Sequence, residues 1–246
     1  MRYLIVSDIH SNLEALQAVL REAESQYERV ICCGDLVGYG ADPNAVLDWA
    51  RVSLSAVVRG NHDKAAVGGN ELEWFNPIAR ASATWTQQTL TEENLAWLAG
   101  LPKGPAHVEG FQILHGSPLD EDDYLINTYD VTHISPYLEA QVSFFGHTHL
   151  QGGFLCHRRG IKRIDRVPDE EDEVVLELDP DLYYLINPGS VGQPRDKDPR
   201  AAWLLYSPQE RLVCYRRTTY DVERAQEKIR RAGLPHGLAE RLAVGR

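Results

Sequence analysis

Short apolar runs alternate with amphipathic segments over the first sixty residues of the chain. The runs at 3–7, 29–34 and 54–60 have the length and the β-branched content of buried strands. Between them, residues 13–23 and 43–51 carry apolar side chains at helical spacing and follow the potential N-caps Asn12 and Asp42. This β-α-β-α-β order predicts a parallel sheet with right-handed crossovers.

The remainder of the chain has a different pattern. Residues 70–105 contain two helical segments, the second of which begins after Thr91 and stops at Gly100. From about residue 106 most segments read as strands, at 107–114, 142–146, 152–156, 183–187, 201–206 and 211–217. A C-terminal helical region follows over 221–246. The change to successive strands predicts two sheets packed face to face with helices outside, within one domain spanning 1–246.

Composition narrows the classes of function. The net charge of −11 does not provide the basic face of a nucleic-acid-binding protein, so long DNA or RNA is disfavoured as a partner. No apolar run approaches the length of a membrane span, so we expect no membrane association. Cys32 and Cys33 are adjacent on a strand and point to opposite faces. With Cys156 and Cys214, we expect them to be reduced thiols of a cytoplasmic protein.

Polar side chains of a restricted set follow five of the predicted strands. They are Asp8 and His10, then Asp35, then Asn61, His62 and Asp63, then His115, and finally His147 and His149. Because residues two apart on a strand point the same way, Asp8 and His10 are expected to share a side. A buried carboxylate is strongly disfavoured unless it is paired or bound to a cation. The carboxyl ends of strands border the ligand crevice of an open α/β sheet, so these side chains are expected to meet at one rim.

The residue types indicate a metal site. A single Asp-x-His or buried His is more often a cap or a hydrogen-bonded core residue, but five such motifs in order favour metal ligands. Imidazole and carboxylate without thiolate suit Mn²⁺, Fe, Zn²⁺, Co²⁺ or Ni²⁺ better than Ca²⁺. Two ions sharing a bridging carboxylate, about 3.5–4 Å apart, would use the whole set. The glycines before Asp35, Asn61 and His147 fit tight turns that let the backbone approach the ions.

The ordered motifs SDIH, GDLVGYG, GNHD, LHGS and GHTH resemble those of the calcineurin-like metallophosphoesterase superfamily. NPGSVGQPRD at 187–196 is similar to a further signature of its small bacterial and archaeal phosphodiesterase-type members. The resemblance implies a four-layer α/β/β/α sandwich of two mixed β-sheets flanked by helices, with a dinuclear centre. It implies that Asp8, His10 and His149 bind the first ion, that Asp35 bridges, that Asn61, His115 and His147 bind the second, and that His62 is the catalytic histidine.

These roles imply hydrolysis of a small phosphoester by a hydroxide shared between two divalent ions, with His62 protonating the leaving group. Asp63 either orients His62 or caps the turn that follows. Members that act as protein-binding scaffolds have an altered catalytic histidine. The intact His62 therefore favours an enzyme over a scaffold.

The second motif departs from that of some relatives. Ser/Thr protein phosphatases and diadenosine tetraphosphate hydrolases carry an Asp-Arg pair where this chain has Gly38 and Tyr39. The guanidinium that would hold a phosphate in a bidentate manner is therefore missing. This weakens the interpretation as a protein phosphatase and favours phosphodiesters or other small phosphoesters, including a small nucleotide. The alternative activities are those of a phosphomonoesterase, a protein phosphatase or a dinucleoside polyphosphate hydrolase.

Two features outside the motifs are candidates for substrate binding. Arg195 either supplies a cation to the substrate or pairs at the surface with Asp196 or Asp198. The insert at 70–105 either forms a lid over the metals, with Asn76 at the substrate, or packs its aromatic side chains against the sheet. Packing is the interpretation we favour for Trp85. The sequence leaves the native metal and the oligomeric state open.

Overall fold

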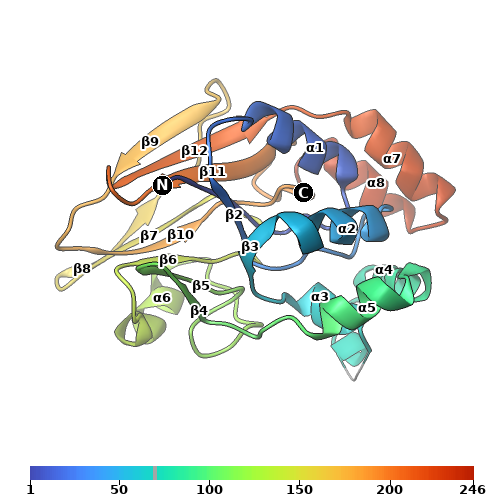
Figure 1. Ribbon diagram of the computed structural model, residues 1–246, viewed down its shortest axis with the longest axis horizontal. Helices are drawn as coiled ribbons and strands as arrows, with labels where there is room; N and C mark the ends of the chain where they lie inside the picture. The colour runs from blue at the N-terminus through green and yellow to red at the C-terminus, as the bar shows by residue number, and fades with distance from the viewer. Residues whose placement is uncertain (69–70) are drawn as a thin grey trace.

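Two β-sheets of six strands each form the middle of the protein in the computed structural model, which describes residues 1–68 and 71–246 (Figure 1). The first sheet has the order β3-β2-β1-β11-β12-β9. Its strands are β1 Tyr3–Val6, β2 Arg29–Cys32, β3 Leu54–Val57, β9 Glu173–Glu177, β11 Ala201–Ser207 and β12 Leu212–Thr218. The second sheet has the order β4-β5-β6-β10-β7-β8. Its strands are β4 Ala106–Val108, β5 Phe111–Ile113, β6 Val142–Phe144, β7 Gly152–His157, β8 Gly160–Ile164 and β10 Tyr183–Asn187.

Both sheets are mixed. In the first, β1, β2 and β3 are parallel, as the β-α-β-α-β order predicts, whereas β11 pairs with β1 in the antiparallel direction. In the second, β5, β6 and β10 are parallel, and the other pairs are antiparallel. The parallel strands of the two sheets carry the motifs, so their carboxyl ends provide the loops of the candidate site.

Alternating side chains of the central strands fill the layers on either side. Tyr3 of β1 points between the sheets, where its ring centroid lies 5.0 Å from that of Phe111. Phe144 joins the same layer, with ring centroids 5.5 Å from Phe111 and 5.1 Å from Tyr206. Leu4 points the other way, toward the helices. Burial on both faces explains why the strand reads as a continuous apolar run.

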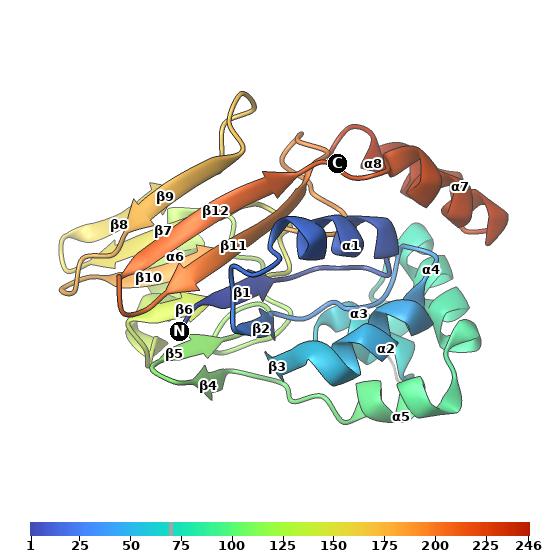
Figure 2. The ribbon, with the colours of Figure 1, turned by 45° about the horizontal axis from the view of Figure 1, so that its top comes forward.

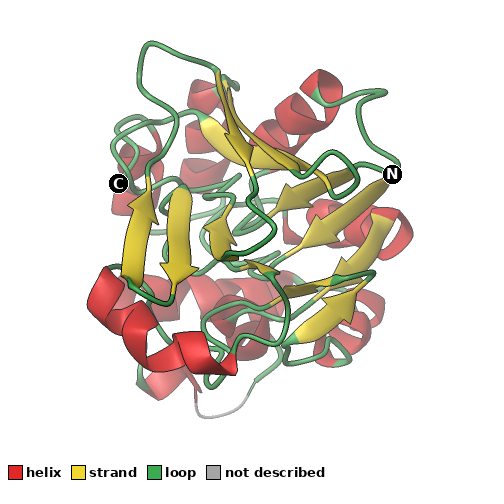
Figure 3. Cartoon of the chain, turned by 90° about the vertical axis from the view of Figure 1, so that its left-hand side faces the viewer, coloured by secondary structure: helices red, strands yellow, loops and turns green. Residues whose placement is uncertain are grey.

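Helices cover the outer faces of the two sheets (Figure 3). The described helices are α1 Leu13–Glu22, α2 Pro43–Ser53, α3 Asn61–Ala66, α4 Pro77–Thr89, α5 Glu92–Ala99, α6 Thr128–Ile134, α7 Val222–Arg231 and α8 His236–Leu242, with two 3₁₀ turns at Glu71–Glu73 and Ser135–Tyr137. Helices α1 and α2 pack on the first sheet and α6 packs on the second. Figure 2 shows α7 and α8 beyond the end of β12. None of the described helices is long and apolar enough to cross a bilayer.

The expected order of elements is confirmed, with differences in detail. The predicted strand at 107–114 is wrong as a single element, because Glu109 and Gly110 have φ of 40° and 97° and turn the chain between the antiparallel strands β4 and β5. The short strands β8 and β9 and the helix α6 were not predicted. Each has several exposed positions, so its apolar pattern is weak. The four cysteines are free thiols, as expected.

The inter-sheet layer gives a first prediction. Phe144→Ala removes a ring that is 0% exposed, so we expect the free energy of unfolding to fall by about 3–5 kcal/mol in urea denaturation. As a control, Tyr129→Ala truncates a ring that is 72% exposed on α6, and its effect should stay below about 1 kcal/mol. Equal losses for the two variants would contradict this account of the core.

Candidate metal centre

The side chains proposed as ligands lie in loops just beyond the strands. Strand β1 ends at Val6, so the expectation that Asp8 and His10 share a side because they alternate along a strand is wrong. Their direction is set by left-handed backbone instead. Five of the residues have φ between +49° and +67°: Asp8, His10, Asp35, His147 and His149. For residues other than glycine this conformation costs roughly 1–2 kcal/mol each, and such strain persists only where surrounding contacts over-determine it.

Backbone hydrogen bonds between neighbouring loops supply those contacts. The amide of Asp8 donates to the carbonyl of Gly34 at 3.0 Å, and the amide of His10 donates to the carbonyl of Asp35 at 3.0 Å. The loops approach so closely that a Cβ on Gly60 would overlap Oδ1 of Asp35. The glycine before Asn61 is therefore required for close packing. Gly34, at φ 102°, also meets the expectation of a tight turn.

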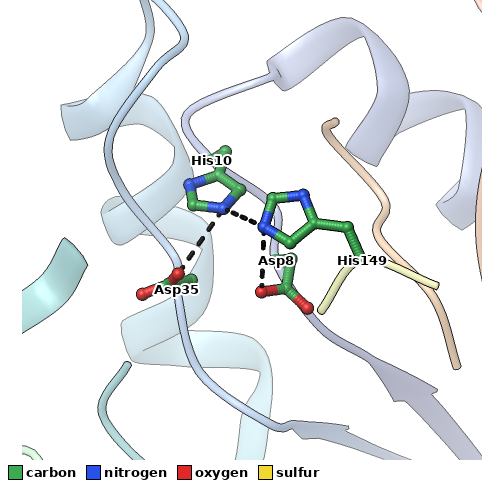
Figure 4. Close-up of side chains that lie close together, drawn as sticks. All are labelled: Asp8, His10, Asp35 and His149. Carbon is green, nitrogen blue, oxygen red and sulfur yellow. Dashed lines mark hydrogen bonds and ion pairs between the residues drawn. The ribbon is translucent and has the colours of Figure 1, made fainter. Parts of the chain in front are cut away.

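One group of neighbouring side chains consists of Asp8, His10, Asp35 and His149 (Figure 4). The Nε2 atom of His10 lies 3.5 Å from Oδ2 of Asp35 and 3.1 Å from Nε2 of His149. The same atom of His149 lies 3.5 Å from Oδ1 of Asp8. All four side chains are buried, and their nitrogen and oxygen atoms converge on a common point.

A second group joins Asp35, His115 and His147. The Nε2 atom of His115 lies 3.4 Å from Oδ2 of Asp35 and 3.4 Å from Oδ1 of Asn61. Asn61 is the first residue of α3, directly after Gly60. Asp35 belongs to both groups, so its carboxylate stands between them.

Backbone carbonyls fix the tautomers of the histidines. Nδ1 of His10, His149 and His115 lies 2.9, 2.6 and 2.8 Å, respectively, from a backbone carbonyl oxygen. Each Nδ1 therefore carries a proton, and Nε2 is the nitrogen directed into the cluster. In His147 the roles are reversed, because Nε2 lies 3.2 Å from the carbonyl oxygen of Asp122. Its free lone pair is on Nδ1.

The ionisation of the cluster fits a bound cation. Burial lowers the pKa of His10 and His149 well below the usual range, so two neutral rings face each other through lone pairs with no proton between them. Burial raises the pKa of Asp8 to about 7. Oδ2 of Asp8 and Oδ2 of Asp35 are buried without a hydrogen-bond partner. Facing lone pairs and unpartnered carboxylate oxygens are stabilised by a divalent cation, so the residues present fit a metal site.

One histidine of the second group has the opposite electrostatic environment. Burial alone would lower the pKa of His115, but the carboxylates of Asp35 and Asp8 raise it to about 10. The histidines in turn hold the pKa of Asp35 well below its usual range, although burial acts in the other direction. Asp35 therefore carries the negative charge on which both groups converge.

His62 stands beside the cluster in the first turn of α3. Its amide donates to Oδ1 of Asp35 at 2.8 Å, and its ring centroid lies 4.3 Å from that of Tyr39 and 4.8 Å from that of Phe75. Its Nδ1 atom is buried without a hydrogen-bond partner. Burial lowers the pKa of His62 to about 4. The ring of His62 is thus held by neighbouring aromatic rings, and its Nδ1 atom makes no hydrogen bond to another described group of the protein.

Asp63 makes capping contacts. Its Oδ2 accepts from the amide of Gly60 at 3.0 Å, and its Oδ1 accepts from the amide of Val37 at 3.1 Å. Neither contact involves the ring of His62. Of the two roles considered for Asp63, these bonds match a cap that ties α3 to the loop after β2.

A pocket of about 470 Å³ opens beside the second group of ligands. It is lined by Tyr39, Asn61, His62, Lys64, Trp74, Phe75, Asn76, Ala79, Asp122, Tyr124 and His147. The ring of Tyr124 lies 3.9 Å from that of His147 and is not identified by any sequence motif, because it reaches the site through the loop after the LHGS motif. Trp74, which is 88% exposed, stands at the same pocket.

The candidates from the insert have separate roles. Oδ1 of Asn76 accepts from the amides of Ile78 and Ala79 and caps α4, while the residue also lines the pocket. Trp85 packs as expected, but against Tyr39 and the C-terminal helices, so the expectation that it packs against the sheet is wrong.

Arg195 lies next to the first group of ligands. Its amide donates to the carbonyl of His149 at 3.3 Å, and its guanidinium donates to the hydroxyl of Tyr39 at 3.3 Å. The two acids considered as surface partners are engaged elsewhere, since Asp196 pairs with Arg217 and Asp198 pairs with Arg200.

Comparison with known proteins identifies the class. Residues 1–209 match the model of the calcineurin-like phosphoesterase superfamily domain, and the chain belongs to that superfamily. Membership indicates a hydrolase that acts on phosphoesters. The chain is 35% identical to the uncharacterized protein MJ0912 of Methanocaldococcus jannaschii over 98% of this chain and 97% of that protein.

Two solved structures share the whole fold. The metallophosphoesterase from Sphaerobacter thermophilus superposes with a TM-score of 0.88 at 35% identity, covering 100% of this chain and 99% of the other. The hypothetical protein PH1004 from Pyrococcus horikoshii OT3 superposes with a TM-score of 0.78 at 19% identity, covering 100% and 98%. The expected family and the α/β architecture of two mixed sheets flanked by helices are confirmed.

Asp35 gives a prediction for metal binding. Because its carboxylate belongs to both groups, Asp35→Asn should reduce the metal content of the purified protein more than Asp8→Asn, which alters one group. Metal content is measured by elemental analysis, and circular dichroism checks that each variant is folded. An exposed acid in the middle of α7, Glu227, provides the control Glu227→Gln, which should retain the wild-type content. If Asp35→Asn retained as much metal as Asp8→Asn, the shared position of Asp35 would have no role in binding.

Proposed function

We propose that the protein is a phosphodiesterase that depends on two divalent metal ions. The observation that carries this proposal is the carboxylate of Asp35, which is shared by two buried groups of ligands next to a pocket that also contains His62. Asp8, His10 and His149 would hold one ion, and Asn61, His115 and His147 would hold the other, with Asp35 between them. The ligand types accept Mn²⁺, Fe, Zn²⁺, Co²⁺ or Ni²⁺.

The metal ions, when bound, lower the pKa of water to provide a nucleophile at neutral pH and neutralise charge on the phosphate oxygens. The residues of the protein supply the orientation of the groups around the ions. His10, His115 and His149 are oriented by backbone carbonyls, so their Nε2 atoms are directed into the centre before any substrate arrives. The left-handed loops keep these positions rigid, which favours a site organised in advance for one geometry.

His62 is the proposed proton donor to the leaving group. The ring is packed between Tyr39 and Phe75 and lines the pocket, so a bound ester would lie within its reach. A substrate anion next to the imidazole favours its protonated form, which burial disfavours in the free site. Asp63 acts as a positioning residue by capping the helix that carries His62.

The lining of the pocket supports an ester with an organic group on both sides of the phosphate. Aromatic rings of Tyr39, Trp74, Phe75 and Tyr124 surround the space next to the second group of ligands. The cation in this lining, Lys64, is already paired with Asp122 at 2.7 Å. A flat organic substituent is stabilised by such walls, whereas a phosphomonoester dianion gains little from them. Asn76, at the edge of the same pocket, is a proposed substrate contact through its free amide group.

A comparison of two synthetic esters tests the proposal. Metal-free protein reconstituted with Mn²⁺, Zn²⁺, Fe²⁺ or Ni²⁺ should hydrolyse bis(p-nitrophenyl) phosphate with a higher kcat/KM than p-nitrophenyl phosphate. The Asp35→Asn variant, purified in parallel, controls for contaminating phosphatases. Preference for the monoester would support a phosphomonoesterase instead. Absence of turnover with every metal, in protein that binds the ions, would support the scaffold alternative.

His62 gives a prediction that depends on the leaving group. For a dinucleotide, whose leaving group is a poorly departing alkoxide, His62→Ala should lower kcat by about 10²–10⁴-fold, the usual contribution of a general acid. For bis(p-nitrophenyl) phosphate, whose leaving group needs no proton, the loss should be much smaller. His133→Ala, which removes an exposed histidine of α6, is the matched control. A similar loss for both substrates with unchanged metal content would contradict the proton-donor role.

A further inference from the structure

Two arginines from distant parts of the chain meet at one oxygen atom. Arg195 lies in the segment between β10 and β11, and Arg241 lies in α8. Oε1 of Gln193 accepts from Nε and Nη2 of Arg195 at 3.3 and 2.9 Å and from Nη1 of Arg241 at 3.2 Å. The two guanidinium groups are therefore neighbours in a chain whose net charge is −11.

No carboxylate among the described residues forms an ion pair with either guanidinium. The nearest acids in sequence are engaged, since Asp196 pairs with the buried Arg217 and Asp198 pairs with Arg200 at 2.7 Å. The other contact of Arg195 is the hydroxyl of Tyr39, over whose ring the guanidinium carbon lies at 5.6 Å from the centroid. Neutral oxygen atoms and a ring thus satisfy some of the donors, and neither charge has a carboxylate in direct contact in the part of the chain that the structure describes.

This arrangement is unfavourable without an anion. Arg195 and Arg241 are both partly removed from water, and burial together with the charge of Arg195 lowers the pKa of Arg241. Two like charges in such a setting repel each other more strongly than they would in bulk water. An oxyanion would relieve the repulsion and accept charge-assisted hydrogen bonds from the remaining N–H groups of both residues.

The pair is connected directly to the first group of metal ligands. The backbone oxygen of Gln193 lies 2.6 Å from Nδ1 of His149, while the side chain of the same residue contacts both arginines. Tyr39 separates this pair from the aromatic pocket, since its hydroxyl contacts Arg195 and its ring contacts His62. The pocket is lined by Asn61 and His147 of the second group and by neither arginine. Tyr39 therefore lies between the aromatic pocket and the cationic pair.

We propose that Arg195 and Arg241 form a subsite for a second phosphate group of the substrate, at a distance from the phosphodiester that is cleaved. This rests on the proposed function and narrows it. The substrate is then a diester with an organic group in the aromatic pocket and an additional phosphate on the opposite side. A short oligonucleotide with a terminal phosphate has both features.

Three dinucleotides test the subsite: ApA, which has only the diester, and pApA and ApAp, which carry a terminal phosphate at either end. For the wild-type protein, kcat/KM for one of the phosphorylated dinucleotides should exceed that for ApA by about tenfold or more, since hydrogen bonds between charged groups are the strong ones. Arg241→Gln should reduce this ratio at least severalfold, mainly through KM. Arg230→Gln, an exposed arginine of α7, is the matched control and should keep the ratio.

The possible outcomes separate the explanations. If Arg241→Gln lowered kcat/KM equally for all three dinucleotides, the arginines would act on the cleaved phosphate or on the local structure, and the subsite would be refuted. A wild-type ratio near one would refute it as well. If the wild-type protein cleaved no dinucleotide, the proposed phosphodiesterase activity would fail separately. Calorimetric binding of the same three compounds to the wild type and to Arg241→Gln would then still show whether the terminal phosphate is recognised.

Discussion

The negative charge of one buried carboxylate, that of Asp35, organises the candidate centre. Its Oδ1 accepts the amide of His62, and its Oδ2 faces Nε2 of His10 and of His115. Its backbone carbonyl accepts the amide of His10. A charge buried this deeply needs compensating partners, and the imidazole of His115, the ring of His10 and the amide of His62 in the first turn of α3 surround it. The second and third motifs are therefore held together through one residue.

That constraint explains why the surrounding backbone is strained. Side chains placed two to four residues after parallel strands must turn inward quickly, and left-handed φ at Asp8, His10 and Asp35 achieves this. Gly60 permits the close approach because it has no side chain to overlap Asp35. The two sheets provide the rigid support, since the aromatic layer between them leaves β1 and β6 little freedom to move. Strain in the loops is thus balanced by packing in the layers.

The sequence was sufficient for the architecture and for the residues of the cluster, but not for its geometry. Apolar runs that end in Asp or His identify both the strands and the buried residues that converge in the cluster. The direction of Asp8 and His10 does not follow from strand periodicity, because periodicity does not reveal left-handed backbone. The hairpin at Glu109 and Gly110 was missed since each of its strands has only three residues.

Residues that reach the site from distant parts of the chain were beyond sequence reasoning. Tyr124 belongs to no motif, and the position of Arg241 becomes meaningful only when α8 has folded against the segment at 187–196. The motif at 187–196 contains Arg195, but no pattern in the sequence indicates that Arg241 lies beside it. The surroundings of a metal cluster are long-range in sequence, whereas its ligands follow local patterns.

The C-terminal helices have a consequence for how the protein can diverge. The matched family domain ends at residue 209, yet α7 and α8 beyond it pack on Tyr39, which in turn touches His10 and His62. Under the proposed function, part of the selectivity would therefore be encoded outside the matched domain that carries the cluster. A substitution in α8 would then alter which molecules are accepted while every residue of the cluster stays the same.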